Sequence, residues 1–217
     1  MFLSKVKDPI SSLTHLIGAI MSIVGLVLLI YNSVFKATTW HIVTFSIFGA
    51  SLILLYTASS VYHGLNISEK INKILRKVDH MMIFVLIAGT YTPICLIPLR
   101  GPWGWSLFGS IWGLALVGIV IKLFYNNIPR WVSTLIYILM GWLVIIAIYP
   151  LVKTVPVPAI LWLTLGGIIY TLGAVIYGLK WPKFNSKVIG FHEIFHLFVM
   201  AGSFCHYWMM YRYVIYL

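Results

Sequence analysis

The chain consists of long, nearly continuous runs of apolar residues separated by short polar segments. Because these runs do not alternate polar and apolar side chains at every second residue, they predict helices rather than the strands of a transmembrane barrel. Each run is close to the roughly 20 residues with which a helix crosses a bilayer. The predicted fold is an all-α integral membrane protein, a seven-transmembrane helix bundle in a single domain covering residues 1–217. Its spans are expected at residues 12–32, 41–62, 79–98, 103–124, 131–150, 159–179 and 190–211.

The composition supports this fold and excludes a soluble one. Hydrophobic residues make up 61% of the chain and charged residues only 9%, whereas about a quarter of the residues of a soluble domain are charged. The first eleven residues, MFLSKVKDPIS, are polar and basic and run directly into a spanning segment, so no cleavable signal peptide is expected. Cys95 and Cys205 both lie inside apolar runs and are expected to be packing residues rather than a disulfide.

Charge predicts the orientation of the bundle. Of the 15 Lys and Arg residues, 11 lie on the side of the N-terminus and 4 on the other side, Lys36, Arg100, Lys153 and Arg212. The positive-inside rule therefore predicts a cytoplasmic N-terminus and, with seven spans, an external C-terminus. The net charge of +11 suits contact with anionic lipid. Nucleic-acid binding is not expected, because the basic residues are spread over several short polar segments, such as the loop expected at residues 66–77.

Ionisable and polar side chains inside the spans gather at one depth. The second span ends in TASSVYH, which places Ser59 and His63 four residues apart on one helical face. The third span begins on the same side of the membrane with Asp79. The seventh span begins there too, with HEIFHLF, which contains His192 and His196. Three segments distant in sequence are therefore expected to meet near the inner leaflet.

These side chains predict a zinc site with hydrolytic chemistry. Zinc at catalytic sites takes three protein ligands and leaves one position for water, and His63, His192 and His196 supply three imidazoles. Asp79 and Ser59 are expected to be catalytic residues that hold and polarise that water. A zinc-activated water is a nucleophile at neutral pH, and this suits the hydrolysis of an amide or ester whose acyl chain lies in the membrane.

Each of these residues also has an ordinary structural alternative. Asp79 directly precedes an apolar run and suits a helix N-cap, and Ser59 can bond back to a carbonyl group one turn earlier. His15 lies at a similar depth in the first span, as a partner of the site or as a packed helix contact. His80 points about 100° away from Asp79 and is expected to join helices. Glu193 completes an H-E-x-x-H pattern, typical of metalloproteases, but also suits the dipole of a first helical turn.

The same residues carry a resemblance to a known family. The segments SSVYHGLN, VDHMMIF and HEIFHLF, on seven spans with an internal N-terminus, resemble the bacterial hemolysin III branch of the progestin and adipoQ receptor family. The wider superfamily includes alkaline ceramidases and shares S-x-x-x-H, a single Asp and H-x-x-x-H. The resemblance implies zinc held by the three histidines, with Ser59 and Asp79 near the metal, in a multi-pass protein of the bacterial cytoplasmic membrane.

Three functions fit these observations. The first is a zinc-dependent, ceramidase-like membrane hydrolase, with membrane lipids as partners and an acyl lipid as substrate. The second is a membrane-active lysin or pore, although a pore is expected to show a polar stripe along most of a span. The third is a receptor or sensor of membrane state with structural zinc, although a structural site is normally closed by four protein ligands. The sequence favours the hydrolase.

Overall fold

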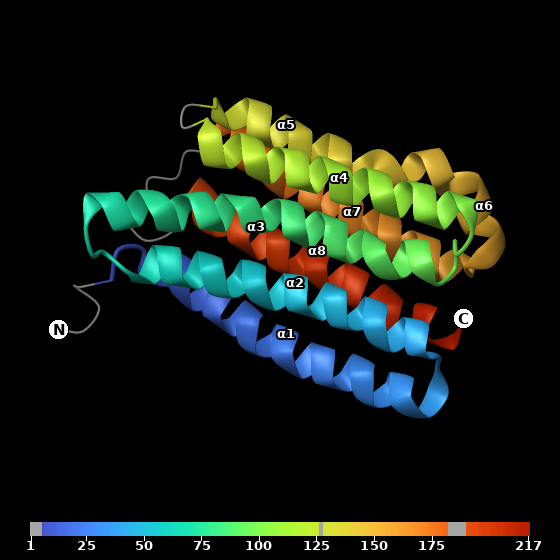
Figure 1. Ribbon diagram of the computed structural model, residues 1–217. Coiled ribbons are helices and arrows are strands. Elements are labelled where there is room, and N and C mark those ends of the chain that lie inside the picture. Colours follow the sequence, from blue (N-terminus) through green and yellow to red (C-terminus); the bar gives the residue numbers. More distant parts are fainter. Residues whose placement is uncertain (1–5, 126–127, 182–189) are drawn as a thin grey trace.

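The regular elements of the protein are helical in the part that the structure, a computed structural model, describes: residues 6–125, 128–181 and 190–217 (Figure 1). Lys5, Lys183 and Lys187 of the charge count lie outside these residues. The α-helices are α1 (Pro9–Lys36), α2 (Thr39–Gly64), α3 (Glu69–Leu96), α4 (Pro102–Phe124), α5 (Arg130–Gly141), α6 (Ile148–Thr154), α7 (Val157–Leu179) and α8 (Phe191–Arg212), and the 3₁₀ segments are η2 (Trp142–Ala147) and η3 (Val214–Tyr216).

The long helices lie side by side in one bundle (Figure 1). Neighbours along the chain pack most extensively, α1 with α2, α2 with α3, α3 with α4 and α7 with α8, and α8 also packs against α1. Helices α1, α3, α5 and α8 all begin at the same end of the bundle, which we call the site end (Figure 1). The described chain therefore starts and finishes at opposite ends of the bundle.

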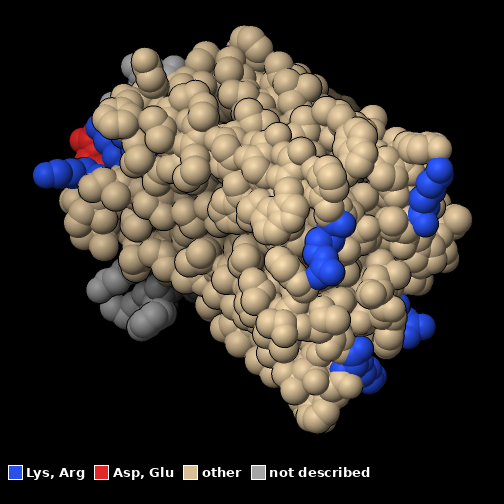
Figure 2. Space-filling model, turned by 45° about the vertical axis from the view of Figure 1, so that its right-hand side comes forward, with Lys and Arg blue, Asp and Glu red and all other residues tan. Residues whose placement is uncertain are grey.

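The outer surface of the bundle is suited to lipid. Within the described residues, six segments are long and apolar enough to cross a bilayer: α1, α2, α3, α4, α7 and the stretch Arg130–Thr154 that joins α5, η2 and α6. Helix α8 lies in the same bundle, and His192, Glu193 and His196 dilute the apolar character of its first turns. Figure 2 shows Lys and Arg side chains toward the ends of the molecule, with uncharged surface between them. The prediction of an all-helical bundle of apolar helices is confirmed.

Helix α3 begins ten residues before the third span predicted from hydropathy. Ser68 caps it by accepting a hydrogen bond from the Ile71 N–H at 3.3 Å, and Glu69 pairs with Lys73 one turn on at 2.6 Å. The segment at residues 66–77, expected to be a loop, is therefore mostly helix. Hydropathy missed it because polar residues with good helix propensity continue a helix beyond its apolar part.

The fifth span is interrupted near its middle. Helix α5 ends at Gly141 and the chain continues as the 3₁₀ segment η2 before α6 resumes. The Tyr91 hydroxyl donates toward the carbonyl oxygens of Met140 at 3.0 Å and Gly141 at 2.7 Å, and it accepts from the Val144 N–H at 2.8 Å. Backbone groups released at a helix break need partners inside a membrane, and this one side chain supplies them.

Both cysteines lie in the interior of the bundle as free thiols, as expected from their positions in apolar runs. Cys95 and Cys205 are buried and free. They belong to a core that includes Phe45, Phe48 and Met209, none of which is measurably exposed. The expectation that these thiols pack rather than form a disulfide is confirmed.

Candidate metal centre

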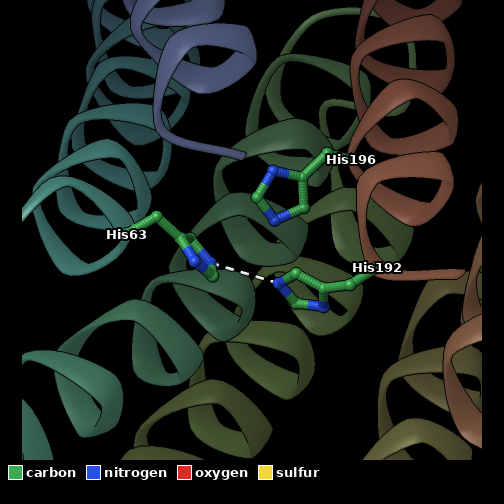
Figure 3. Close-up of side chains that lie close together, drawn as sticks. All are labelled: His63, His192 and His196. Carbon is green, nitrogen blue, oxygen red and sulfur yellow. Dashed lines mark hydrogen bonds between the residues drawn. The ribbon is translucent and has the colours of Figure 1, made fainter. Parts of the chain in front are cut away.

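Three imidazole rings converge at the site end of the bundle (Figure 3). His63 lies in the last turn of α2, and His192 and His196 lie four residues apart on one face of the first turns of α8. Nε2 of His63 is 3.1 Å from Nε2 of His192. One ring nitrogen from each of the three residues lies within 4.8 Å of the others. The structure thus brings together the three histidines predicted from the sequence.

This donor set fits a zinc ion. Tetrahedral zinc with nitrogen ligands at 2.0–2.1 Å separates those nitrogens by about 3.3 Å, so the observed separations require only small side-chain shifts. His63 and His196 are buried, and Nδ1 of His196 is a buried nitrogen without a hydrogen-bond partner in the described part of the chain. Buried imidazoles with free ring nitrogens are what a metal site requires, because a ligating nitrogen must carry a free lone pair.

Asp8 orients His63 and is not among the site residues predicted from the sequence. Its Oδ2 accepts a hydrogen bond from Nδ1 of His63 at 2.9 Å, and its backbone N–H donates to the His63 carbonyl at 2.9 Å. This leaves Nε2 of His63 facing the other imidazoles with a lone pair, as in the carboxylate–histidine pairs of zinc proteins. A signal was available, since Asp8 is one of only four acidic residues and precedes the first span at the same end of the bundle.

Asp79 and Ser59 lie beside the three imidazoles. Ser59 is on α2, one turn before His63, and Asp79 is on α3. Both residues line a small cavity of about 30 Å³ together with His192 and His196. A cavity of this size, with polar groups on its wall, has room for a water molecule. Asp79 lies ten residues inside α3, so it is not the N-cap of this helix.

His15 and His80 border the same cavity. The ring of His15 stacks on that of His196, with centroids 3.6 Å apart and planes 10° apart, and neither of its nitrogens has a partner among the described residues. Stacked rings cannot both direct a lone pair at one ion, so His15 supports His196 rather than adding a ligand. His80 joins α3 to α7, because its Nε2 lies 3.2 Å from the Tyr177 hydroxyl.

Glu193 is engaged away from the three imidazoles. Its Oε2 accepts from the Gly190 N–H at 2.8 Å, which caps the start of α8. Its Oε1 accepts from the Ser11 hydroxyl at 2.8 Å, which ties α8 to α1. Glu193 does not line the small cavity, so the H-E-x-x-H pattern here supplies two candidate ligands and a helix cap.

A larger, mainly apolar cavity of about 170 Å³ adjoins the small one. The two share five wall residues, Leu55, Ile83, Tyr177, Phe195 and Val199. From this shared wall the larger cavity extends between α3, α5, α7 and α8. The imidazoles and the carboxylate of Asp79 therefore lie at one end of an apolar space within the bundle.

Comparisons with known proteins agree with these features. The family model described as haemolysin-III related matches residues 3–207. The chain is 43% identical to hemolysin-3 of Bacillus cereus, over 91% of this chain and 88% of the relative. It is 42% identical to the hemolysin-3 homolog of Bacillus subtilis (strain 168), over 91% and 90%. A more distant likeness, 26% identity over 93% of this chain and 82% of the relative, links it to the human monocyte to macrophage differentiation factor.

Proposed function

Because the chain belongs to the haemolysin-III-related family, a branch of the progestin and adipoQ receptor family, we propose that it is a zinc-dependent hydrolase of lipid amides or esters. The family and the apolar helices make it a multi-pass membrane protein of the bacterial cell membrane. The observation that carries the proposal is the position of the three imidazoles and Asp79 at one end of an apolar space.

His63, His192 and His196 are the proposed zinc ligands. When bound, zinc supplies Lewis-acid chemistry, which makes water nucleophilic at neutral pH and polarises a carbonyl group. Three protein ligands leave a coordination position open, as in catalytic rather than structural sites. Asp8 holds His63 in one tautomer, and the stacked ring of His15 holds the plane of His196. His63 and His196 are therefore preorganised by a residue that directly precedes α1 and by one on α1.

Asp79 is the proposed general base and acid. Its carboxylate accepts the proton of the attacking water, the water oxygen bonds to the acyl carbon, and the C–N or C–O bond of the lipid breaks. The same carboxylate returns the proton to the departing amine or alcohol, so the products are a carboxylic acid and that amine or alcohol. The Ser59 hydroxyl, on the wall of the same small cavity, is the proposed partner that orients Asp79 or the water.

The apolar cavity is the proposed binding site for the acyl chain. Its wall is mainly aliphatic and aromatic, and its shared boundary with the small cavity brings the end of a bound chain close to Asp79. Apolar pockets with a few convergent polar groups are typical of ligand sites. The site end is proposed to face the cytoplasm, because 11 of the 15 basic residues lie on that side.

The other two functions have less support. The polar groups of the centre gather at one end of the bundle, whereas a conducting pore needs a polar path through it. A purely structural zinc site leaves unexplained a carboxylate on the wall of an adjoining cavity that has room for water. The name hemolysin-3 describes the Bacillus cereus relative.

The proposal is tested on purified protein with a panel of N-acyl sphingoid and ester lipids. Release of fatty acid is expected from the zinc-loaded protein, and its loss is expected after chelation, with recovery when zinc is restored. Asp79→Asn should retain zinc and lose turnover. Release of fatty acid that persists in chelated protein and in Asp79→Asn would reject a zinc-dependent reaction at this centre.

A further inference from the structure

His206 on α8 is a buried histidine far from the metal centre. Its side chain is only 6% exposed, and its Nδ1 has no hydrogen-bond partner in the part of the chain that the structure describes. The ring forms part of the wall of the apolar cavity. An unbonded polar group inside a membrane protein is costly, so an imidazole retained at such a position suggests a function.

The neighbours of His206 accommodate the ring without hydrogen-bonding to it. A Cβ at Gly166 of α7 would lie 2.8 Å from Nε2 of His206, so the absence of a side chain there makes room for the imidazole. Tyr170 stacks on the ring with centroids 5.4 Å apart, but its hydroxyl is 2.7 Å from the Ser203 hydroxyl. Tyr56 donates to the same Ser203 oxygen at 2.7 Å. The nearby hydroxyl groups are thus bonded to one another.

The position of His206 along the bundle sets its distance from the centre. It lies ten residues after His196 on α8, which corresponds to roughly 15 Å at the helical rise of 1.5 Å per residue. Gly166, which contacts it, lies eleven residues before Tyr177 on α7, which corresponds to about 16 Å. The distances along α8 and α7 therefore give the same separation between His206 and the centre. An extended acyl chain with its carbonyl at the centre reaches this level after about a dozen carbon atoms.

We propose that His206 is a hydrogen-bonding subsite for a hydroxyl group carried about twelve carbons along an acyl chain. This rests on the proposed function, because it assumes that the cavity holds the chain and the centre holds its carboxyl end. The imidazole offers a donor or an acceptor on the wall of a mainly apolar cavity. A hydroxyl group at that level gains this partner, whereas one at a level lined by aliphatic side chains loses its hydration without replacement.

The test measures binding and needs no turnover. Labelled octadecanoic acid bound to the intact protein in detergent is displaced by unlabelled octadecanoic, 12-hydroxyoctadecanoic or 7-hydroxyoctadecanoic acid. The 12-hydroxy acid should bind about tenfold more tightly than octadecanoic acid, the scale of one buried hydrogen bond. The 7-hydroxy acid carries the same group away from both the centre and His206 and should show no such gain.

Two variants at His206 complete the experiment. In His206→Phe, which keeps an aromatic ring, the 12-hydroxy acid should bind no more tightly than octadecanoic acid. His206→Gln keeps a hydrogen-bonding side chain and should retain part of the preference. Equal affinity of the two acids in the unmodified protein, a preference that survives in His206→Phe, or no displaceable binding would overturn the subsite. A preserved preference without hydrolysis of any lipid would instead reject the hydrolase and leave the subsite standing.

Discussion

Asp8 and His63 are joined by two hydrogen bonds, one from the imidazole to the carboxylate and one between their backbones, each 2.9 Å long. Asp8 directly precedes α1, and His63 is the second-last residue of α2. The pair therefore fixes the relative positions of two helices at the site end. It also fixes which nitrogen of His63 faces the other two imidazoles.

Removing this carboxylate should weaken zinc binding without removing a ligand. We expect Asp8→Ala to lower zinc affinity about 10- to 100-fold, the usual effect of losing a group that orients a ligating histidine. Competition with a chromophoric chelator measures it. Glu69→Gln is the matched control, because Glu69 is exposed and pairs only with Lys73. Equal affinity in Asp8→Ala and the unmodified protein would separate Asp8 from the centre.

The arrangement of the centre could be anticipated because membrane burial makes polar side chains informative. Ser59, His63, Asp79, His192 and His196 stood out as polar residues at one depth of apolar spans. In the structure, four of them, Ser59, Asp79, His192 and His196, line one small cavity. The imidazole of His63 lies next to those of His192 and His196. Asp8 was missed because it lies outside the apolar runs. An acidic residue in a polar segment has no desolvation penalty, so its presence there does not indicate a function.

The helix ends were less predictable for a related physical reason. Hydropathy reports the part of a helix that contacts lipid, whereas α3 extends nearly three turns beyond it into a polar region. The interruption after Gly141 depends on the Tyr91 hydroxyl, which comes from another helix fifty residues earlier in the chain. A contact of that kind follows from the packing of the bundle and not from local sequence.

Loss of any one imidazole should reduce bound zinc sharply. We expect His63→Ala, His192→Ala and His196→Ala each to lower the zinc content of purified protein to a small fraction of one ion per chain, because two imidazoles hold zinc much less tightly than three. Elemental analysis by mass spectrometry measures this content.

The control for the zinc measurement is His41→Ala. His41 is equally buried, but it contacts Thr38 and the Val214 carbonyl at the other end of the bundle. This variant can lose stability, yet it should keep its zinc. Full zinc content in His63→Ala would remove α2 from the centre and leave only the pair on α8.

The break in the fifth span should depend on one hydroxyl group. Tyr91→Phe removes the partner of the Val144 N–H and of two carbonyl oxygens. We expect a loss of about 1–3 kcal/mol in the free energy of unfolding, the cost of leaving buried backbone groups unsatisfied. Tyr31→Phe, at a position 62% exposed, is the control. Thermal unfolding in detergent compares the two, and equal midpoints would show that the break does not need Tyr91.

The proposed orientation of the bundle, inferred from its charges, is tested by reporter fusions. A fusion after Asn66, between α2 and α3, should report the cytoplasm, because the site end carries most of the basic residues. Fusions after Ala37, between α1 and α2, and after Leu217 should both report the external side. An external signal at Asn66 would invert the proposed orientation. Matching signals at Asn66 and Leu217 would mean that the chain crosses the membrane an even number of times between these two points.

Asp79 and Glu193 should differ in their contribution to catalysis. Asp79 lines the small cavity beside Ser59, whereas both oxygens of Glu193 are used to cap α8 and to bind Ser11. Asp79→Asn keeps the size and shape of the side chain but removes its capacity to accept a proton. Turnover of an acyl lipid should therefore fall roughly 10²-fold or more, the scale of a lost general acid or base.

Glu193→Gln is the matched change for Asp79→Asn, since both replace a carboxylate by its amide. The Gln side chain can still cap Gly190 through its carbonyl oxygen, so zinc content and most of the turnover should remain, with a small loss of stability. Assays of zinc and of fatty-acid release on both variants give the ranking directly. If Glu193→Gln lost turnover and Asp79→Asn kept it, the glutamate would be the general base, as in H-E-x-x-H metalloproteases. The contacts of Glu193 with the start of α8 and with α1 would then have to break for catalysis to occur.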